Sequence, residues 1–276
     1  MGSINEPRVE IFDSPLDQAV QQRDNDVLVM VADALRSGRL VLAYQPVVQA
    51  QRPDRIAFHE ALVRVLDPTG RVIPAREFIG AVEATDLGRR LDCLSLSKGL
   101  DALEQTPGLR LAVNMSARSI GYAPWLKVLE RGLARDPSIG ERLILEITES
   151  SAMLVPELVT DFMRRQQEKG LCFALDDFGA GATSFRYLRD FYFDLVKIDA
   201  GFVRGVARSA DNQVLCQVLQ SIAKHFDMFT VAEAVESQED AEWLAAAGID
   251  CLQGYLYGAP SISPPWQAEA ARKRPH

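Results

Sequence analysis

Histidine and cysteine are scarce in this chain, which has three histidines and four cysteines among 276 residues. No two cysteines form a C-x-x-C pair, so neither a disulfide framework nor a thiolate metal site is expected. Too few histidines are present for a histidine-based zinc site. Scattered single thiols are typical of buried apolar positions in a protein of the reducing cytoplasm.

Long apolar runs and basic stripes are also lacking. No run reaches the ~18 apolar residues of a membrane-spanning helix, and the first residues lack the basic and apolar segments of a signal peptide. Thirty basic residues against 38 acidic ones leave a formal charge of −8, which argues against duplex nucleic acid as the main partner. We therefore expect a cytoplasmic protein without a membrane or duplex nucleic-acid partner.

No linker rich in Pro, Gly and Ser divides the chain. The hydrophobic fraction of 47% and the charged fraction of 25% are ordinary for a folded protein. Ser14 is a suitable N-cap and Pro15 a suitable first residue for a helix. We expect a partly helical N-terminal extension over residues 1–27, one α/β barrel over 28–262 and a C-terminal tail over 263–276.

Short apolar runs alternate with longer amphipathic stretches along the chain, as in an α/β protein with buried parallel strands. Eight runs separated mostly by helical patterns predict a (β/α)₈ barrel. The connection between Val48 and Ile56 is too short for a helix and predicts a hairpin, so the first strand is expected to be antiparallel to the second. The runs are Leu40–Val48, Ile56–Val65, Leu111–Met115, Leu143–Ile147, Leu171–Leu175, Phe193–Ile198, Phe229–Ala232 and Ile249–Leu252.

Polar side chains stand at or near the ends of these predicted strands. Because a barrel gathers the carboxyl ends of its strands on one face, the side chains would converge there and their carboxylates would repel unless a cation neutralised them. The oxygen-rich set suits Mg²⁺ or Mn²⁺, and adjacent aspartates could bridge two ions ~3.5–4 Å apart. The residues are Glu60, Asn114, Glu146, Glu149, Asp176, Asp177, Lys197, Glu233, Glu236 and Gln253.

Each of these residues, taken alone, also has a structural explanation. An aspartate can cap a helix, an asparagine can form a turn, and a lysine can belong to an ordinary ion pair. Carboxylates in a barrel mouth would also fit a glycosidase. The occurrence of one polar residue at each successive strand end favours a shared site.

Several motifs of this chain, in this order, resemble the EAL domain, the bacterial cyclic di-GMP phosphodiesterase. The likeness covers roughly residues 28–260 and implies a TIM-like barrel with an antiparallel first strand. It is carried by Tyr44-Gln45-Pro46, Glu60-Ala61-Leu62 with Arg64, Asn114-Met115-Ser116, Glu146-Ile147-Thr148-Glu149-Ser150, Asp176-Asp177-Phe178-Gly179-Ala180-Gly181, Lys197-Ile198-Asp199, Ala232-Glu233-Ala234-Val235-Glu236 and Gln253-Gly254-Tyr255.

The resemblance implies hydrolysis of cyclic di-GMP to linear pGpG with two Mg²⁺ or Mn²⁺ ions. By the family's pattern, the first ion is held by Glu60, Asn114, Glu146 and Asp176, and the second by Asp176, Asp177 and Glu233. The same pattern implies that Lys197 holds or helps to deprotonate the attacking water, that Glu236 and Gln253 complete the surround of metal and water, that Glu149 anchors the loop Phe178–Ser184, and that Gln45 and Arg64 contact the substrate.

Three positions depart from the family's pattern without removing a metal ligand. Ala182 replaces a large residue, Ala234 a glycine and Ala259 an arginine. The alternative to an enzyme is a non-catalytic cyclic di-GMP receptor or a protein-interaction module on the same barrel. Members of the family often dimerise, so a homodimer is a further expectation.

Overall fold

The computed structural model describes residues 14–180 and 188–266, so Ala182 and parts of the predicted extension and tail lie outside the described residues. The strands are β1 (Leu40–Gln49), β2 (Arg52–Leu66), β3 (Val72–Pro74), β4 (Leu111–Asn114), β5 (Leu143–Thr148), β6 (Cys172–Phe178), β7 (Leu195–Ile198), β8 (Phe229–Ala232) and β9 (Cys251–Gln253). The α-helices are α1 (Pro15–Arg36), α2 (Ile79–Val82), α3 (Asp86–Gln105), α4 (Ala123–Arg135), α5 (Glu149–Ala152), α6 (Pro156–Gln167), α8 (Ala200–Val203), α9 (Ala210–His225) and α10 (Gln238–Ala246). Short 3₁₀ helices are η1 (Ala75–Glu77), η2 (Ala117–Ser119), η3 (Pro137–Arg142) and η4 (Val206–Arg208).

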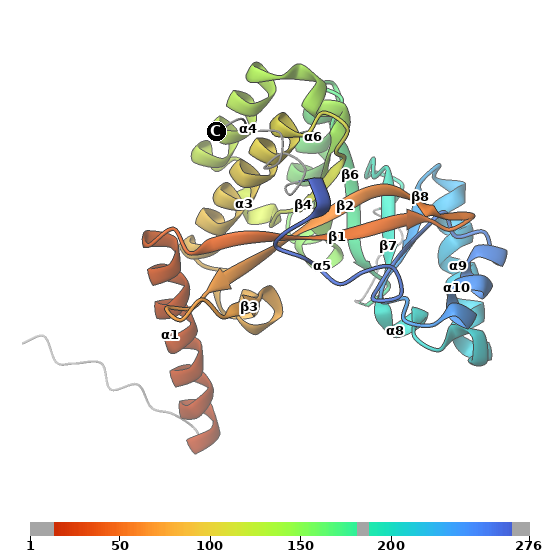
Figure 1. Cartoon of the computed structure of the whole chain (residues 1–276), viewed down its shortest axis with the longest axis horizontal. Coiled ribbons are helices and arrows are strands. Elements are labelled where there is room, and N and C mark those ends of the chain that lie inside the picture. The colour runs from red at the N-terminus through yellow and green to blue at the C-terminus, as the bar shows by residue number, and fades with distance from the viewer. Residues whose placement is uncertain (1–13, 181–187, 267–276) are drawn as a thin grey trace, which may run out of the picture.

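Eight strands close into a barrel in the order β1-β9-β8-β7-β6-β5-β4-β2, and β2 pairs with β1 to complete the ring (Figure 1). β1 is antiparallel to both of its neighbours, β2 and β9. The other pairs in the ring are parallel. The predicted TIM-like barrel with an antiparallel first strand is therefore confirmed, and each of the eight apolar runs overlaps a strand of the ring.

The first hairpin and an additional strand differ in detail from the prediction. Ala50 and Gln51 form the turn of the hairpin, so Pro53 lies inside β2 and not in the connection. β3 is not predicted by the sequence pattern, because three residues are too few to show a period. It pairs antiparallel with the far end of β2, where Arg64 lies opposite Pro74, and stays outside the closed ring.

The barrel interior consists of two layers that follow from the two-residue period of a strand. The layer nearer the amino ends of the parallel strands is apolar. It is one cluster of Val47, Phe58, Ala112, Ile144, Ala174, Leu195 and Val231. Two residues further along each parallel strand, and two residues back on β1, the alternation reaches a polar side chain. These residues are Gln45, Glu60, Asn114, Glu146, Asp176, Lys197 and Glu233. The polar ring therefore lies at the carboxyl ends of the parallel strands, above an apolar floor.

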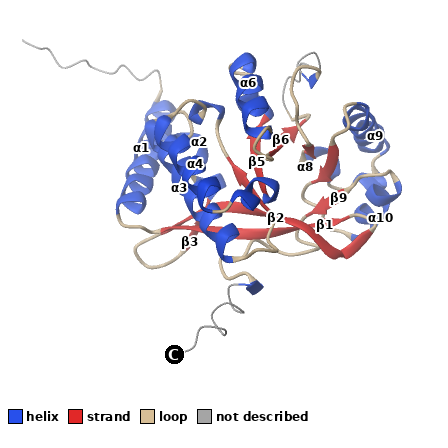
Figure 2. Cartoon of the chain, turned by 90° about the horizontal axis from the view of Figure 1, so that it is seen from above, coloured by secondary structure: helices blue, strands red, loops and turns tan. Residues whose placement is uncertain are grey.

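Helices pack around the outside of the barrel, as Figure 2 shows for α3, α6, α9 and α10. α10 and α1 both begin at serine N-caps, and the one at Ser14 is predicted from the sequence. The hydroxyl of Ser237 accepts a hydrogen bond from the backbone N–H of Asp240 at the start of α10, and that of Ser14 accepts one from Asp17 at the start of α1. α1 runs through residue 28, where we place the boundary between the extension and the barrel. Among the described residues, no helix has the length and hydropathy needed to cross a membrane.

The C-terminal segment, residues 261–266, packs on the outer face of the β1–β2 hairpin. The short turn of this hairpin leaves no room for a covering helix between its strands. Ser261 pairs with Tyr44 of β1 through two backbone hydrogen bonds. The ring of Trp266 then packs edge-on against His59, at 4.5 Å between ring centroids, and against Tyr44, at 5.2 Å. Burial there lowers the pKa of His59 to about 4. The segment thus belongs to the folded core.

Replacing Trp266 by alanine is expected to lower the free energy of unfolding by about 1–2 kcal/mol, because a half-buried ring is lost from Tyr44 and His59. The melting temperature should fall by several degrees, measured by thermal unfolding followed by circular dichroism. The control is Tyr192→Ala, since this aromatic side chain is 57% exposed and its loss should change little. Equal effects of the two variants would contradict the covering role of the segment.

Candidate active site

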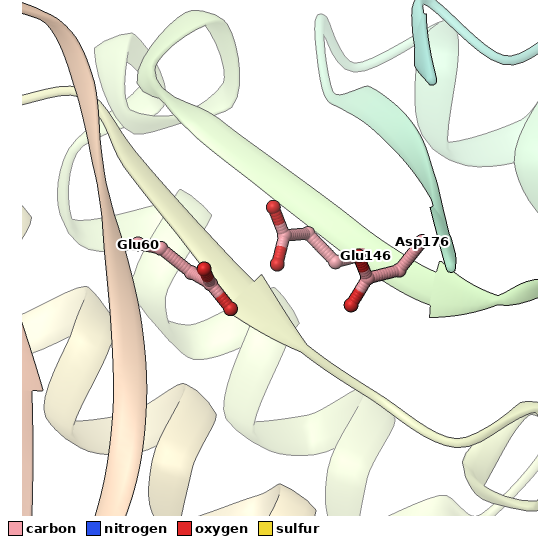
Figure 3. Close-up of side chains that lie close together, drawn as sticks. All are labelled: Glu60, Glu146 and Asp176. Carbon is pink, nitrogen blue, oxygen red and sulfur yellow. The ribbon is translucent and has the colours of Figure 1, made fainter. Parts of the chain in front are cut away.

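Four carboxylates surround the ammonium group of Lys197 at the polar end of the barrel. Lys197 Nζ lies 2.8 Å from Glu233, 3.0 Å from Asp176, 3.3 Å from Glu60 and 3.5 Å from Glu146. Its side chain is 1% exposed. Figure 3 shows Glu60, Glu146 and Asp176 pointing toward a common point from separate strands. The alternation of each strand brings these predicted site residues together.

Burial and the charges within this cluster shift the pKa values of its members in different directions. Burial acts to lower the pKa of Lys197, but the surrounding carboxylates raise it well above its usual value. Burial and the charge of Glu60 raise the pKa of Glu146 well above the usual range of a glutamate. Burial also raises the pKa of Glu233 to about 8. For Glu60, burial is outweighed by Lys197 and by side-chain hydrogen bonds, so its pKa is lowered.

The arrangement of oxygen atoms fits divalent cations. Two groups, Glu60 with Glu146 and Asp176, and Asp176 with Asp177 and Glu233, each offer carboxylate oxygens within 4.8 Å of one another. At an effective dielectric of ~20, two such charges repel by about 3–4 kcal/mol. Glu146 Oε1 is buried without a hydrogen-bond partner among the described residues, which is costly unless a cation or ligand satisfies it. Asp176 belongs to both groups and is suited to bridge two ions.

Asp177 reaches the cluster through an irregularity in β6. Strict alternation would turn adjacent side chains to opposite faces of the strand. The pairing of β6 with β7 shifts register between Leu175 and Phe178, and Asp177 has a φ of 57°. This left-handed conformation is one that aspartate tolerates better than most residues. Burial and the charge of Asp176 raise the pKa of Asp177 to about 6.

Side-chain amides continue the ring from the carboxylates to β1. Gln253 Nε2 donates to Glu60 Oε2 at 2.5 Å and to Gln45 Oε1 at 3.2 Å. Asn114 Nδ2 donates to Glu60 at 2.9 Å and to Glu146 at 3.2 Å. A metal ligand at Asn114 would need its Oδ1 on this side, and rotation of the amide about one bond exchanges the two atoms.

Three predicted site residues lie around the cluster and not within it. Glu149 is buried, and its carboxylate accepts a hydrogen bond at 3.1 Å from the backbone N–H of Gly179, two residues after Asp177. Glu236 is half-exposed and pairs with Arg204 at 3.3 Å, and it is not one of the described carboxylates that pair with Lys197. Arg64 lies four residues after Glu60 on β2, close enough for the charges of the two side chains to interact. Their predicted roles remain predictions.

Two features beside the site are not evident from the sequence pattern. Ala234 has a φ of 52°, directly after Glu233, so the position that the family fills with glycine carries backbone strain here. Asp92 of α3 accepts hydrogen bonds from the Ser116 N–H at 3.0 Å and from the Ser119 hydroxyl at 2.6 Å. It thereby holds the segment that follows Asn114. In sequence it is indistinguishable from an exposed helical aspartate.

Comparison with known proteins agrees with this geometry. The model of the EAL domain family matches residues 29–260, and the chain belongs to that family. Among curated proteins, it is 30% identical over 258 residues to the cyclic di-GMP phosphodiesterase PdeB of Shewanella oneidensis, covering 92% of this chain and 30% of the relative. It is 31% identical to the cyclic di-GMP phosphodiesterase PdeF of Escherichia coli, covering 82% of this chain and 30% of the relative. The chain thus spans about a third of the length of these relatives.

Solved structures show the same architecture with a bound nucleotide. A structure described as the PaMucR phosphodiesterase in complex with c-di-GMP superimposes with a TM-score of 0.76 at 29% identity, covering 88% of this chain and 99% of that one. The FimX EAL domain from Pseudomonas aeruginosa, bound to c-di-GMP, gives a TM-score of 0.76 at 25% identity, covering 86% of this chain and 97% of that one.

Glu146→Gln is expected to raise the melting temperature of the metal-free protein by several degrees, because it removes one of four carboxylates that share Lys197. The same variant should lose most of the thermal stabilisation that Mn²⁺ gives the unaltered protein. Thermal unfolding with EDTA and with Mn²⁺ measures both effects. Glu130→Gln, a change of the same charge at an exposed position of α4, is the control, and a full Mn²⁺ response in Glu146→Gln would contradict the metal assignment.

Proposed function

We propose that this chain hydrolyses cyclic di-GMP to linear pGpG in a reaction that requires Mg²⁺ or Mn²⁺. The observation that carries the proposal is the buried cluster of carboxylates around Lys197, in a barrel of the EAL family. In this reaction water adds to one phosphorus atom, one P–O ester bond breaks, and the leaving ribose oxygen takes a proton. The products are one phosphomonoester end and one free hydroxyl.

Two ions would be held by the carboxylates already described. Glu60, Asn114, Glu146 and Asp176 are the proposed ligands of the first ion, and Asp176, Asp177 and Glu233 those of the second. When bound, the ions supply positive charge to the phosphoryl oxygens and lower the pKa of water. Glu149, through Gly179, holds the backbone next to Asp177 and so fixes the position of that ligand.

Lys197 is the proposed catalytic residue for the attacking water. Its ammonium group remains charged because the carboxylates around it raise its pKa. It can therefore orient water and stabilise the charge that develops during attack. Because Lys197 is buried within the polar ring, bulk water is excluded from its ammonium group, which strengthens the electrostatic effect of that group. Gln253 and, after rearrangement of its ion pair with Arg204, Glu236 would complete the surround.

The substrate would enter from the open side of the polar ring, where Gln45 and Arg64 are its proposed contacts. A guanidinium can bind a phosphate through two parallel hydrogen bonds. All four cysteines are free thiols, which supports a cytoplasmic location for the reaction. The homodimer expected from the family is part of this proposal only as an assembly to be tested.

The decisive test is product analysis by liquid chromatography after mixing the purified protein with cyclic di-GMP, with Mn²⁺ or with EDTA. We expect pGpG with Mn²⁺ only, and a loss of at least 100-fold in Glu60→Ala because a ligand of the first ion is removed. Circular dichroism checks that the variant is folded. Bound but uncleaved cyclic di-GMP in the unaltered protein would instead indicate a non-catalytic receptor.

Lys197→Ala is expected to lower kcat by at least ~100-fold while KM changes only a few-fold, because the group acts on water and not on substrate affinity. Steady-state kinetics at saturating Mn²⁺ measures both constants. Lys197→Arg, which keeps the charge, controls for the loss of neutralisation among the carboxylates. A rise in KM at unchanged kcat would contradict the assigned role.

A further inference from the structure

α5 is a single helical turn, Glu149–Ala152, that follows directly after β5. β4 and β6 pair with β5 on its two sides. On one side Asn114 of β4 lies opposite Glu146, and on the other side Asp176 of β6 lies opposite Thr148. The chain that leaves β4 and the chain that leaves β6 therefore both leave the sheet beside α5. Each of these two segments directly follows proposed metal ligands.

Ser151 joins α5 to the segment that leaves β4. Its side chain is buried, and its Oγ accepts a hydrogen bond from the backbone N–H of Ala117 at 2.8 Å. Ala117 is the first residue of η2, and the first N–H groups of a helix have no acceptor within that helix. Because Ala117 is buried as well, loss of the Ser151 hydroxyl would remove the acceptor of a buried N–H, which costs free energy.

Three consecutive backbone N–H groups directly after Asn114 donate hydrogen bonds to three different elements, β5, α3 and α5. The pairs are Met115 with the carbonyl of Glu146 at 2.9 Å, Ser116 with the carboxylate of Asp92 at 3.0 Å, and Ala117 with Ser151 Oγ at 2.8 Å. The carboxylate of Asp92 also accepts a hydrogen bond from the hydroxyl of Ser119 at 2.6 Å. The backbone that carries Asn114 is therefore held by side chains that lie outside the carboxylate cluster.

Glu149 joins the same turn to the segment that leaves β6, because its buried carboxylate accepts the hydrogen bond from the backbone N–H of Gly179. Side chains two residues apart in an α-helix point in directions roughly 200° apart. Glu149 and Ser151 thus reach toward opposite sides of the turn. α5 connects the backbone after Asn114 with the backbone after Asp177.

We propose that Ser151 and Asp92 are positioning residues of the metal site, and that α5 is a bracket between the ligands of the two ions. The inference rests on the proposed function, since it takes Asn114 and Asp177 as metal ligands. Ser151 and Asp92 act through the backbone next to Asn114, as Glu149 acts through the backbone next to Asp177. Groups that orient a ligand before the ion arrives increase the affinity of the site for that ion.

Isothermal titration calorimetry with MnCl₂, in the absence of nucleotide, tests the bracket without relying on catalysis. Ser151→Ala is expected to weaken Mn²⁺ binding about tenfold, since loss of a group that orients a metal ligand typically costs at least that factor. Ser150→Ala is the matched control, because Ser150 belongs to the same turn but has an exposed side chain. Circular dichroism checks that each variant is folded.

Asp92→Ala is the second variant and acts on the same segment from α3. It should weaken Mn²⁺ binding by a similar factor, whereas Asp92→Asn, which keeps one oxygen for the two donors, should retain most of the affinity. Steady-state kinetics gives an independent measurement. In Ser151→Ala the Mn²⁺ concentration for half-maximal activity should rise about tenfold, while kcat at saturating Mn²⁺ stays within about threefold of the unaltered protein.

The possible outcomes separate this inference from the proposed function. Weaker Mn²⁺ binding in Ser151→Ala and Asp92→Ala, but not in Ser150→Ala, supports the bracket. Unchanged Mn²⁺ binding in both folded variants, or a loss of kcat that excess Mn²⁺ does not restore, would overturn the bracket alone. If the unaltered protein binds Mn²⁺ but does not cleave cyclic di-GMP, the proposed function fails and calorimetry still decides the bracket. An unaltered protein that does not bind Mn²⁺ would overturn both.

Discussion

Lys197 and the four carboxylates within 3.5 Å of it form the interaction on which the rest of the site depends. One ammonium cannot neutralise four carboxylates, so the cluster holds protons or cations. Its geometry comes from five different strands of a closed barrel, and a closed barrel resists local relaxation because each strand is paired on both sides. The scaffold therefore keeps together charges that a more flexible fold would separate. Such stored repulsion is a usual property of metal sites and a usual cost in stability.

The end of β2 with β3, and the C-terminal residues 261–266, extend this scaffold where the helical layer is interrupted. A hairpin between β1 and β2 removes the helix that would normally follow the first strand. Trp266 and Ser261 cover the outer face of the hairpin, while β3 and α1 support the part of β2 that rises above the mouth. The end of β2, which carries Arg64, thus extends beyond the closed ring and pairs there with β3.

Much of this structure is predictable from the sequence. Eight apolar runs have the length of strands and alternate with helical patterns, which predicts the barrel. Polar residues near the ends of these runs predict the ring around Lys197. Asp177 does not follow, because its direction depends on a register shift between two strands that are remote in sequence. The packing of Trp266 on His59 is also a long-range contact. The role of Asp92 cannot be recognised from the sequence, because an acidic residue on a helix is usually exposed to water.

The two layers of the barrel interior also limit how the family can change in length. A single inserted residue within a strand would rotate everything after it by half a period and exchange interior and exterior side chains. At Glu146 or Lys197, that exchange would move a charged side chain from the barrel interior to the apolar outer face of the strand, which packs against the helices. Insertions and deletions are therefore expected in the loops, and strands should vary by substitution alone. Relatives that share about 30% of their residues with this chain can thus differ widely in loop length and keep the same polar ring.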